Sequence, residues 1–131
     1  MNFLFYPDTE EFAQNIPYEE AEGVVGKEIK KLKKQHKNIY LRVKSFLNKI
    51  CEVNNLNEFY ERETIRDLGG GLNEIRIPKQ NKGGVFRIYF CKSKNNDNLL
   101  ILLDAEFKHK KKGERIEIAR KKQKTYMNNN K

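Results

Sequence analysis

The spacing of the apolar residues changes near Leu72, and this change constrains the fold more than any other feature. Before Leu72, apolar residues recur at steps of three and four, which is typical of amphipathic helices, here over Tyr18–Gln35 and from Asn38 to Cys51. After Leu72, apolar and polar residues alternate, which is typical of β-strands. The predicted strands are Leu72–Ile77, Val85–Lys92 and Leu99–Phe107.

Three further segments complete the predicted fold. Asn2–Tyr6 adds an edge strand, Phe59–Asp67 forms a further helical turn, and a basic helix extends from about Glu114 to Met127. The continuous apolar run Leu99–Leu103 predicts a central strand that is covered on both faces. We therefore expect an α+β fold. A twisted, mainly antiparallel sheet of about four strands would carry the two N-terminal helices on one face and be followed by the C-terminal basic helix.

Length and residue usage limit the class of protein. With 131 residues, 37% of them hydrophobic, the chain is expected to form one domain spanning residues 1–131. Cys51 and Cys91 make no disulfide framework, and His36 and His109 lack ligand-type neighbours, so no metal is expected. The glycines at 69–71 precede a strand instead of following one, so no nucleotide cofactor is expected either. Because no long apolar run or secretory signal is present, we expect a soluble cytoplasmic protein without a membrane partner.

The net charge of +9 is distributed unevenly along the chain. Residues 1–35 carry −2, residues 36–71 carry +1 and residues 72–131 carry +10. Positive charge concentrated in one part of a protein attracts polyanions, and nucleic acid is the commonest polyanion inside cells. An alternative is that a Lys- and Asn-rich composition only solvates the surface, although this does not explain why the N-terminal part differs.

Arg76 and Arg87 are the most informative pair of residues. If the hairpin between the first two predicted strands of the C-terminal half closes symmetrically, the two arginines face each other on neighbouring strands, with Glu74 and Tyr89 alongside. Like charges in this position destabilise a sheet, so the pair favours an anionic ligand such as phosphate. The alternative is that Glu74 or Glu106 neutralises an arginine and that both arginines are ordinary surface residues.

A run of cations follows the third of these strands and continues into the terminal helix. Its members are Lys108, Lys110, Lys111, Lys112, Arg115, Arg120, Lys121, Lys122 and Lys124, with His109 inside the run. Since the run begins at a strand end beside the two arginines, it predicts a basic rim for RNA binding. The alternatives are a solvated tail for the run, a surface position for His109, and simple packing for Tyr126 on the apolar side of the last helix.

Four segments of the chain resemble one family of proteins. The segments are LNEIRIP, VFRIYF, LLILLDAEFKHKKK and ERIEIARKKQKTY. Their order and spacing resemble the RelE/HigB superfamily of bacterial type II toxins, in the phage-related HigB-like branch, over about the last 60 residues. The first 70 residues match only in the order of the elements.

This resemblance implies a function as well as a fold. Many members are ribosome-dependent messenger RNA endonucleases that need no metal, in which the ribose 2′-hydroxyl attacks the adjacent phosphate. The resemblance implies a catalytic role for Arg76, Arg87, Lys108, Lys110 and Tyr126, and His109 lies between the matched lysines. It also implies a small antitoxin as partner, of the helix-turn-helix kind.

Two other classes of function stay open. One is a module that binds RNA or the ribosome without cleaving RNA, which Asp104 and Glu106 favour because two acids beside a phosphate site weaken it. The other is a toxin that acts on a protein, since the ParE branch has a similar fold and poisons gyrase.

Overall fold

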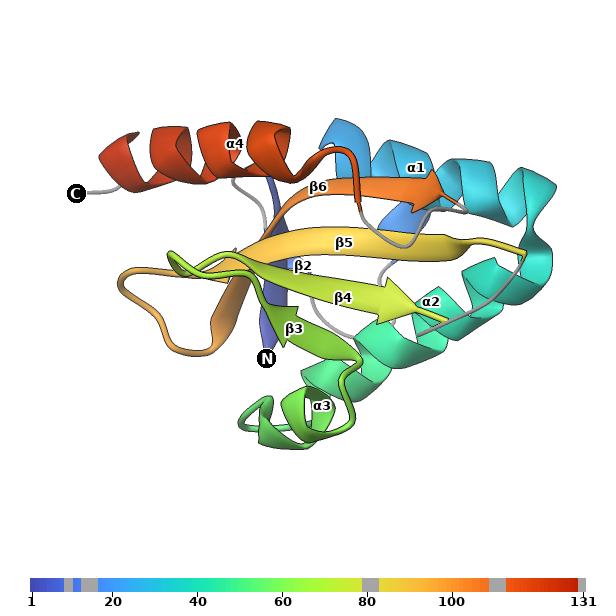
Figure 1. Cartoon of the computed structure of the whole chain (residues 1–131), viewed down its shortest axis with the longest axis horizontal. Helices are drawn as coiled ribbons and strands as arrows, with labels where there is room; N and C mark the ends of the chain where they lie inside the picture. Colours follow the sequence, from blue (N-terminus) through green and yellow to red (C-terminus); the bar gives the residue numbers. More distant parts are fainter. Residues whose placement is uncertain (9–10, 13–16, 79–82, 109–112, 130–131) are drawn as a thin grey trace.

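A computed structural model describes residues 1–8, 11–12, 17–78, 83–108 and 113–129 of the chain. His109, Lys110, Lys111 and Lys112 lie outside the described residues, as does the centre of the loop that joins the two arginine-bearing strands. The elements, in chain order, are β1 (Asn2–Phe5), β2 (Glu11–Phe12), the 3-10 turn η1 (Tyr18–Glu20), α1 (Gly23–Gln35), α2 (Lys37–Cys51), α3 (Asn57–Glu61), β3 (Ile65–Asp67), β4 (Asn73–Ile77), β5 (Val85–Lys92), β6 (Leu99–Lys108) and α4 (Ile116–Asn129) (Figure 1).

The strands form one sheet in the order β2-β1-β6-β5-β4-β3. Strand β1 runs parallel to β6, and every other neighbouring pair is antiparallel. The α+β class and the mainly antiparallel sheet are confirmed. The expected count of about four strands is wrong, because the described part of the sheet has six, with short strands β2 and β3 added at its two edges.

The segment Phe59–Asp67, predicted as helical, divides between two elements. Helix α3 ends at Glu61, Glu63 adopts a left-handed conformation with φ 59°, and the chain then extends as β3. Ile65 is buried beside β4, whose edge offers hydrogen bonds that a longer helix would forgo. The correction therefore follows from a tertiary partner, since a three-residue strand has almost no periodic signal of its own.

The first predicted helix is also shorter than expected. The turn η1 and helix α1 are separated because Gly23 has φ +89° and lies against the backbone of Tyr6, where a side chain at this position would clash. Helix α2 follows α1 after His36, as the predicted helical hairpin. The described helices include none that is long and apolar enough to span a membrane.

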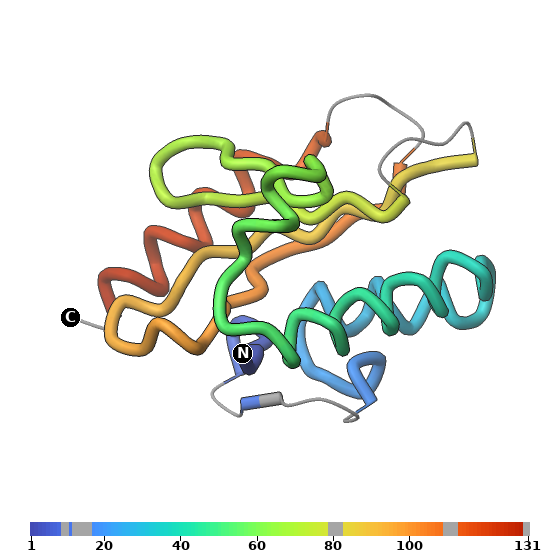
Figure 2. Tube along the Cα trace, turned by 90° about the horizontal axis from the view of Figure 1, so that it is seen from below, coloured from blue at the N-terminus to red at the C-terminus, as the bar shows by residue number. Residues whose placement is uncertain are grey.

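One face of the sheet carries α1 and α2, as expected (Figure 2). Its apolar side chains pack against the buried stripes of the two helices. The strand residues in this cluster are Phe3, Phe5, Ile65, Ile75, Ile77, Phe86, Ile88, Phe90, Leu100, Leu102 and Ala105, and the helical ones include Val25, Ile29, Leu32, Val43, Leu47 and Ile50. We call this side the helical face.

The opposite face is covered in part by α4, which lies along β5 and β6 (Figure 1). Ala119 and Tyr126 of α4 are buried there, in an apolar cluster with residues of β5 and β6 and with Leu72. The rest of this face carries charged side chains and forms the candidate site.

Candidate functional site on the polar face of the sheet

Charged and polar side chains cover the second face of β3, β4, β5 and β6 at the ends of the strands that α4 leaves free. Alternation along each strand places them together, and the register of the strands aligns them in two rows. One row holds Arg66, Glu74, Tyr89 and Asp104, and the next holds Arg76, Arg87 and Glu106, with Lys108 beyond them. We call this group of eight residues the polar face.

The predicted pairing of the two arginines is confirmed. Arg76 lies opposite Arg87 in the β4–β5 ladder, and Glu74 lies opposite Tyr89. Glu74 separates the charges of the two arginines. Its Oε1 is 3.7 Å from Nε of Arg76, and its Oε2 is 3.5 Å from Nε of Arg87. The alternative that Glu74 neutralises an arginine is therefore confirmed as well.

The two arginines differ in their access to solvent. The side chain of Arg87 is 2% exposed, whereas that of Arg76 is 11% exposed and its Nη2 donates a hydrogen bond to the backbone oxygen of Glu63, 2.9 Å away. The expectation that both are ordinary surface residues is wrong for Arg87. Neighbouring strands and the chain after β6 cover it, and only Arg76 extends to the open edge of the sheet.

Burial perturbs the ionisation of Glu74 and of Arg76. Desolvation raises the pKa of Glu74 above its usual value, although Arg87 and Arg76 act in the opposite sense. Desolvation, together with the neighbouring Arg66, lowers the pKa of Arg76. Glu74 and Arg76 are thus charged groups in positions where loss of water costs free energy. Such positions are typical of sites that bind or act on charged groups, and also of structural ion-pair networks.

Asp104 and Glu106 are buried and have specific partners. Asp104 accepts a hydrogen bond from Nε of Arg115 at 3.0 Å and lies 3.6 Å from Nζ of Lys122. Glu106 accepts hydrogen bonds from the Tyr89 hydroxyl at 2.8 Å and from the backbone N–H of Arg115 at 2.8 Å. These two acids attach the start of α4 to the sheet, so they are structural partners of the basic segment.

Gly113 closes over the middle of the polar face. A side chain at this position would collide with the hydroxyl of Tyr89 and come against Arg87 and Glu106. Only a glycine therefore allows the backbone to lie this close to the strands. Burial, reinforced by the hydrogen bond to Glu106, raises the pKa of Tyr89 well above its usual value, so this hydroxyl stays protonated at any physiological pH.

The remaining predicted RNA-binding residues have different surroundings. Lys108 is 46% exposed at the end of β6, and its Nζ lies 3.8 Å from Glu114. Arg120 donates to the backbone oxygens of Leu68 and Gly69 at 2.7 and 3.0 Å, so it holds the turn before β4. Lys121 is exposed on α4.

Tyr126 does not reach the rim of the polar face. It is 8% exposed and packs in the apolar cluster beneath α4, which confirms the alternative of simple packing. It follows Ile116 by ten residues, roughly 15 Å along a helix axis. The catalytic role that the resemblance implies for it finds no support in this geometry.

One cation of the site, Arg66, was not predicted from the sequence, and the partner of a second, Lys122, was not predicted either. Arg66 was placed in a helical turn, but it lies on β3 opposite Glu74 and is exposed. Lys122 was predicted as a member of the basic run, and in the structure it pairs with Asp104. The alternation of Ile65 and Arg66 is the signal that could have identified Arg66, but it spans too few residues to be distinguished from a helix end.

The site contains more positive than negative side chains. Its cations are Arg66, Arg76, Arg87, Lys108 and the overlying Arg115 and Lys122, and its carboxylates are Glu74, Asp104 and Glu106. The described residues include no group of three or more His, Cys, Asp or Glu that could hold a metal ion. The arrangement is suited to contact with phosphate groups at its margins, where Arg66, Arg76, Lys108 and Arg115 reach solvent.

Comparisons of the chain with protein-family models, with curated proteins and with solved structures found no match.

Proposed function

We propose that this protein is the toxin of a type II toxin–antitoxin system, of the RelE/HigB kind, and that it cuts messenger RNA on the ribosome. The observation that carries the proposal is the facing pair Arg76 and Arg87, flanked on the same side of the sheet by Arg66 and Lys108. The order of a strand, two helices, antiparallel strands and a basic helix supports the same relationship. Its place of action would be the cytoplasm, and its partners a ribosome and a helix-turn-helix antitoxin.

The chemistry requires stabilisation of charge more than it requires an acid or a base. Attack by the ribose 2′-hydroxyl on the adjacent phosphorus forms a 2′,3′-cyclic phosphate and breaks the bond from phosphorus to the 5′-oxygen of the next nucleotide. The hydroxyl proton passes to water, and the departing 5′-oxygen takes a proton from water. Negative charge gathers on the non-bridging oxygens, where Arg76 and Lys108 are the accessible cations of the matched set. Positioning of the substrate by the ribosome would supply much of the remaining rate enhancement.

Arg87 has a positioning role in this proposal. It lies beside Oε2 of Glu74, while Arg76 lies beside Oε1 of the same carboxylate. Glu74 therefore fixes the orientation of the Arg76 side chain. It can do so only as long as Arg87 balances part of the negative charge of Glu74. This role replaces the direct phosphate contact expected of Arg87, because a side chain that is 2% exposed does not meet a substrate.

A second candidate is a module that binds RNA or the ribosome without cleavage. The specific observation in its favour is that Tyr126 lies in an apolar cluster while the Tyr89 hydroxyl is bound to buried Glu106. These two groups are therefore not presented to a substrate for proton transfer. Both candidates predict the same binding surface, and they differ in whether RNA is cut.

Induced expression in a bacterial host tests the proposal. We expect the wild-type chain to arrest growth and to produce new 5′ ends in ribosome-bound messages, mapped by primer extension. Arg76→Gln and Lys108→Gln should each reduce cleavage by about 10²-fold, as expected for loss of one charged donor. Lys30→Gln, an exposed change on α1, is the matched control and should remain toxic.

The two candidates give different results in this experiment. Arrest with ribosome association but without new RNA ends would support the non-cleaving module and contradict the nuclease. A wild-type chain that neither arrests growth nor associates with ribosomes would contradict both. Thermal unfolding of each variant shows whether Arg76→Gln acts through the site, and exposed Lys108 provides the variant least coupled to folding.

A further inference from the structure

A second basic depression lies between α2 and the edge of the sheet, away from the centre of the polar face. It has a volume of about 240 Å³ and lies among α2, the end of α3, the residues before β3, and the end of β4. We call it the edge cleft. Its lining comes from segments that are far apart in the sequence, so no single motif marks it.

The lining of the edge cleft is strongly cationic. Arg42 and Lys49 of α2, Arg62 after α3 and Arg76 of β4 all contribute to it, and among the residues that the structure describes none that lines it is an aspartate or a glutamate. Four cations that converge without an acid among them repel one another. Such a cleft is energetically favourable when an anion occupies it.

Acidic neighbours outside the lining reduce this charge only in part. Arg62 pairs with Glu58 at 2.9 Å, but both side chains are more than half exposed, where such pairs contribute little. Arg76 shares Glu74 with Arg87. Within the described part of the chain, neither Arg42 nor Lys49 takes part in an ion pair, so both can bind an external anion.

Apolar rings form part of the same lining. Phe46 lies between Arg42 and Lys49 on α2 and meets Phe59 edge-on, with ring centroids 5.1 Å apart. Phe59 is buried, whereas Phe46 is partly exposed. Cations with an aromatic surface between them are the combination that binds single-stranded nucleic acid.

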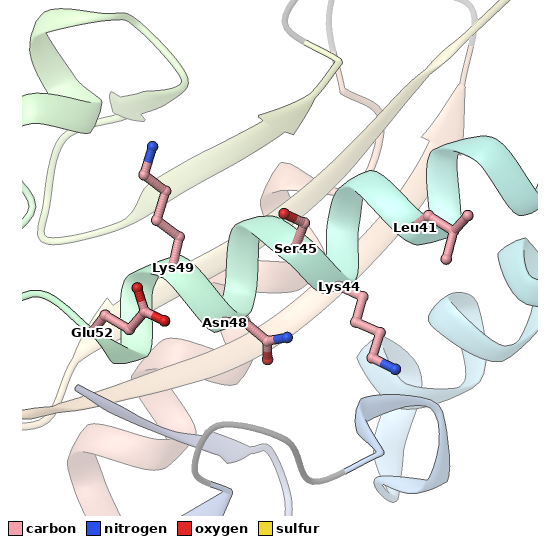
Figure 3. A pocket seen from close by; sticks show the side chains of 6 residues that line it. All are labelled: Leu41, Lys44, Ser45, Asn48, Lys49 and Glu52. Carbon is pink, nitrogen blue, oxygen red and sulfur yellow. The ribbon is translucent and has the colours of Figure 1, made fainter.

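The other side of α2 has a different character. Figure 3 shows the depression there, lined by Leu41, Lys44, Ser45, Asn48, Lys49 and Glu52. In this view Lys44 and Lys49 point away from the helix in opposite directions. Lys49 lines both depressions, whereas Lys44 does not line the edge cleft. Lys44 therefore serves as a control for Lys49, because it has the same residue type and lies on the same helix.

We propose that the edge cleft binds the sugar–phosphate backbone of single-stranded RNA. Arg76 connects the cleft with the polar face, since it lines the cleft and also faces Arg87 in the sheet. Arg42 and Lys49 are seven residues apart on α2, roughly 10 Å along the axis, which exceeds the reach of one phosphate group. The identification of the ligand as RNA rests on the proposed function. The edge cleft would then be the path along which the RNA extends from the polar face.

Binding of a labelled RNA tests the edge cleft. The probe is a fluorescein-labelled ten-nucleotide oligouridylate, and its Kd is measured by fluorescence anisotropy at several concentrations of potassium chloride. Arg42→Gln with Lys49→Gln should weaken binding about tenfold at the lowest salt, and should reduce the slope of log K against log salt by about 1.4 if each cation neutralises one phosphate. Lys37→Gln with Lys44→Gln removes the same charge from α2 and should weaken binding less than about twofold with the slope unchanged.

The outcomes separate failure of the cleft from failure of the proposed function. Equal loss in the two double variants means that binding follows net charge, which overturns the edge cleft. If Lys108→Gln and Arg66→Gln weaken binding while the cleft variant binds normally, the cleft is overturned and the proposed function stands. A wild-type chain that does not bind the probe and does not arrest growth overturns both.

Two additions keep the test decisive. Inorganic phosphate should compete no better than chloride at equal ionic strength, and strong displacement by phosphate alone would mark a single-anion site and overturn the RNA assignment. If the cleft variant does not fold, Arg62→Gln, at an exposed position, replaces it. This single change should weaken binding and lower the slope by about 0.7, and unchanged binding overturns the proposal.

Discussion

The two faces of the sheet are built from the same strands but are stabilised in different ways. Along β5, Phe86 and Ile88 enter the helical face, while Arg87 and Tyr89 enter the polar face, and all four are buried. On the helical face, burial is favourable because nearly all the strand side chains there are apolar. On the polar face, burial is tolerated only because each charge has an opposite charge or a hydrogen-bond partner beside it.

The comparison shows that burial does not distinguish a structural face from a functional one. What distinguishes the two faces is whether their buried side chains contact other side chains that are exposed to solvent. The helical face is closed by α1 and α2, whereas the cations of the polar face reach solvent at its margins through Arg66, Arg76 and Lys108. Side chains that hold a charged network in place are thus connected to side chains that can meet a ligand.

The largest effect is expected on the helical face. Phe86→Ala should lower the free energy of unfolding by about 3–5 kcal/mol, because a fully buried ring leaves a cavity. Urea denaturation measures this, and Lys92→Ala at the exposed end of the same strand is the control. A loss below 1 kcal/mol would mean that the helices do not close on this face as described.

The second largest effect on stability is expected from removing one charge of the buried ion pair on the polar face. Arg87→Ala should cost about 3 kcal/mol, since it leaves Glu74 buried beside only one arginine. The double variant Arg87→Met/Glu74→Leu should be more stable than Arg87→Ala, because it removes both charges of the pair. If it is less stable than Arg87→Ala, the pair is not the source of the cost.

A smaller effect, with a definite sign, concerns pH. The pKa of Glu74 is raised by burial, so the folded state holds its proton more tightly than the unfolded state. Its contribution to stability is present below the unfolded pKa and is lost as pH rises through the raised folded pKa. The unfolding free energy of the wild type minus that of Glu74→Gln should therefore fall as pH rises from about 4.

Glu19 provides the opposite case in the helical layer. Burial acts to raise its pKa, but hydrogen bonds from its own backbone, Lys33 and Tyr40 together lower it. Its contribution is present above the unfolded pKa and is lost as pH falls through the lowered folded pKa. The difference between wild type and Glu19→Gln should thus rise with pH over this range, and the same sign for both glutamates would contradict the contrast between the two layers.

The periodicity of the side chains was enough to identify the longer helices and strands. Alternation of side chains is a property of one strand, so β5 was predicted with its observed bounds. The pairing of Arg76 with Arg87 also followed, because a closed hairpin relates its two strands by local geometry alone. The packing of Tyr126 on the apolar side of its helix was one of the two alternatives that the sequence left open.

The surroundings of the charged side chains on the polar face depend on the tertiary structure. The sequence allowed several ion pairs for the two arginines, and the pairing with Glu74 was one of them. The burial of Arg87 beneath Gly113 depends on contacts between residues that are far apart in the sequence. The same is true of Arg66, which became part of the site when a three-residue strand joined the sheet edge, and of the edge cleft, whose cations come from three separate elements. Periodicity reports which side of an element a residue occupies, but the free energy of a charge depends on every group near it in space, including groups distant along the chain.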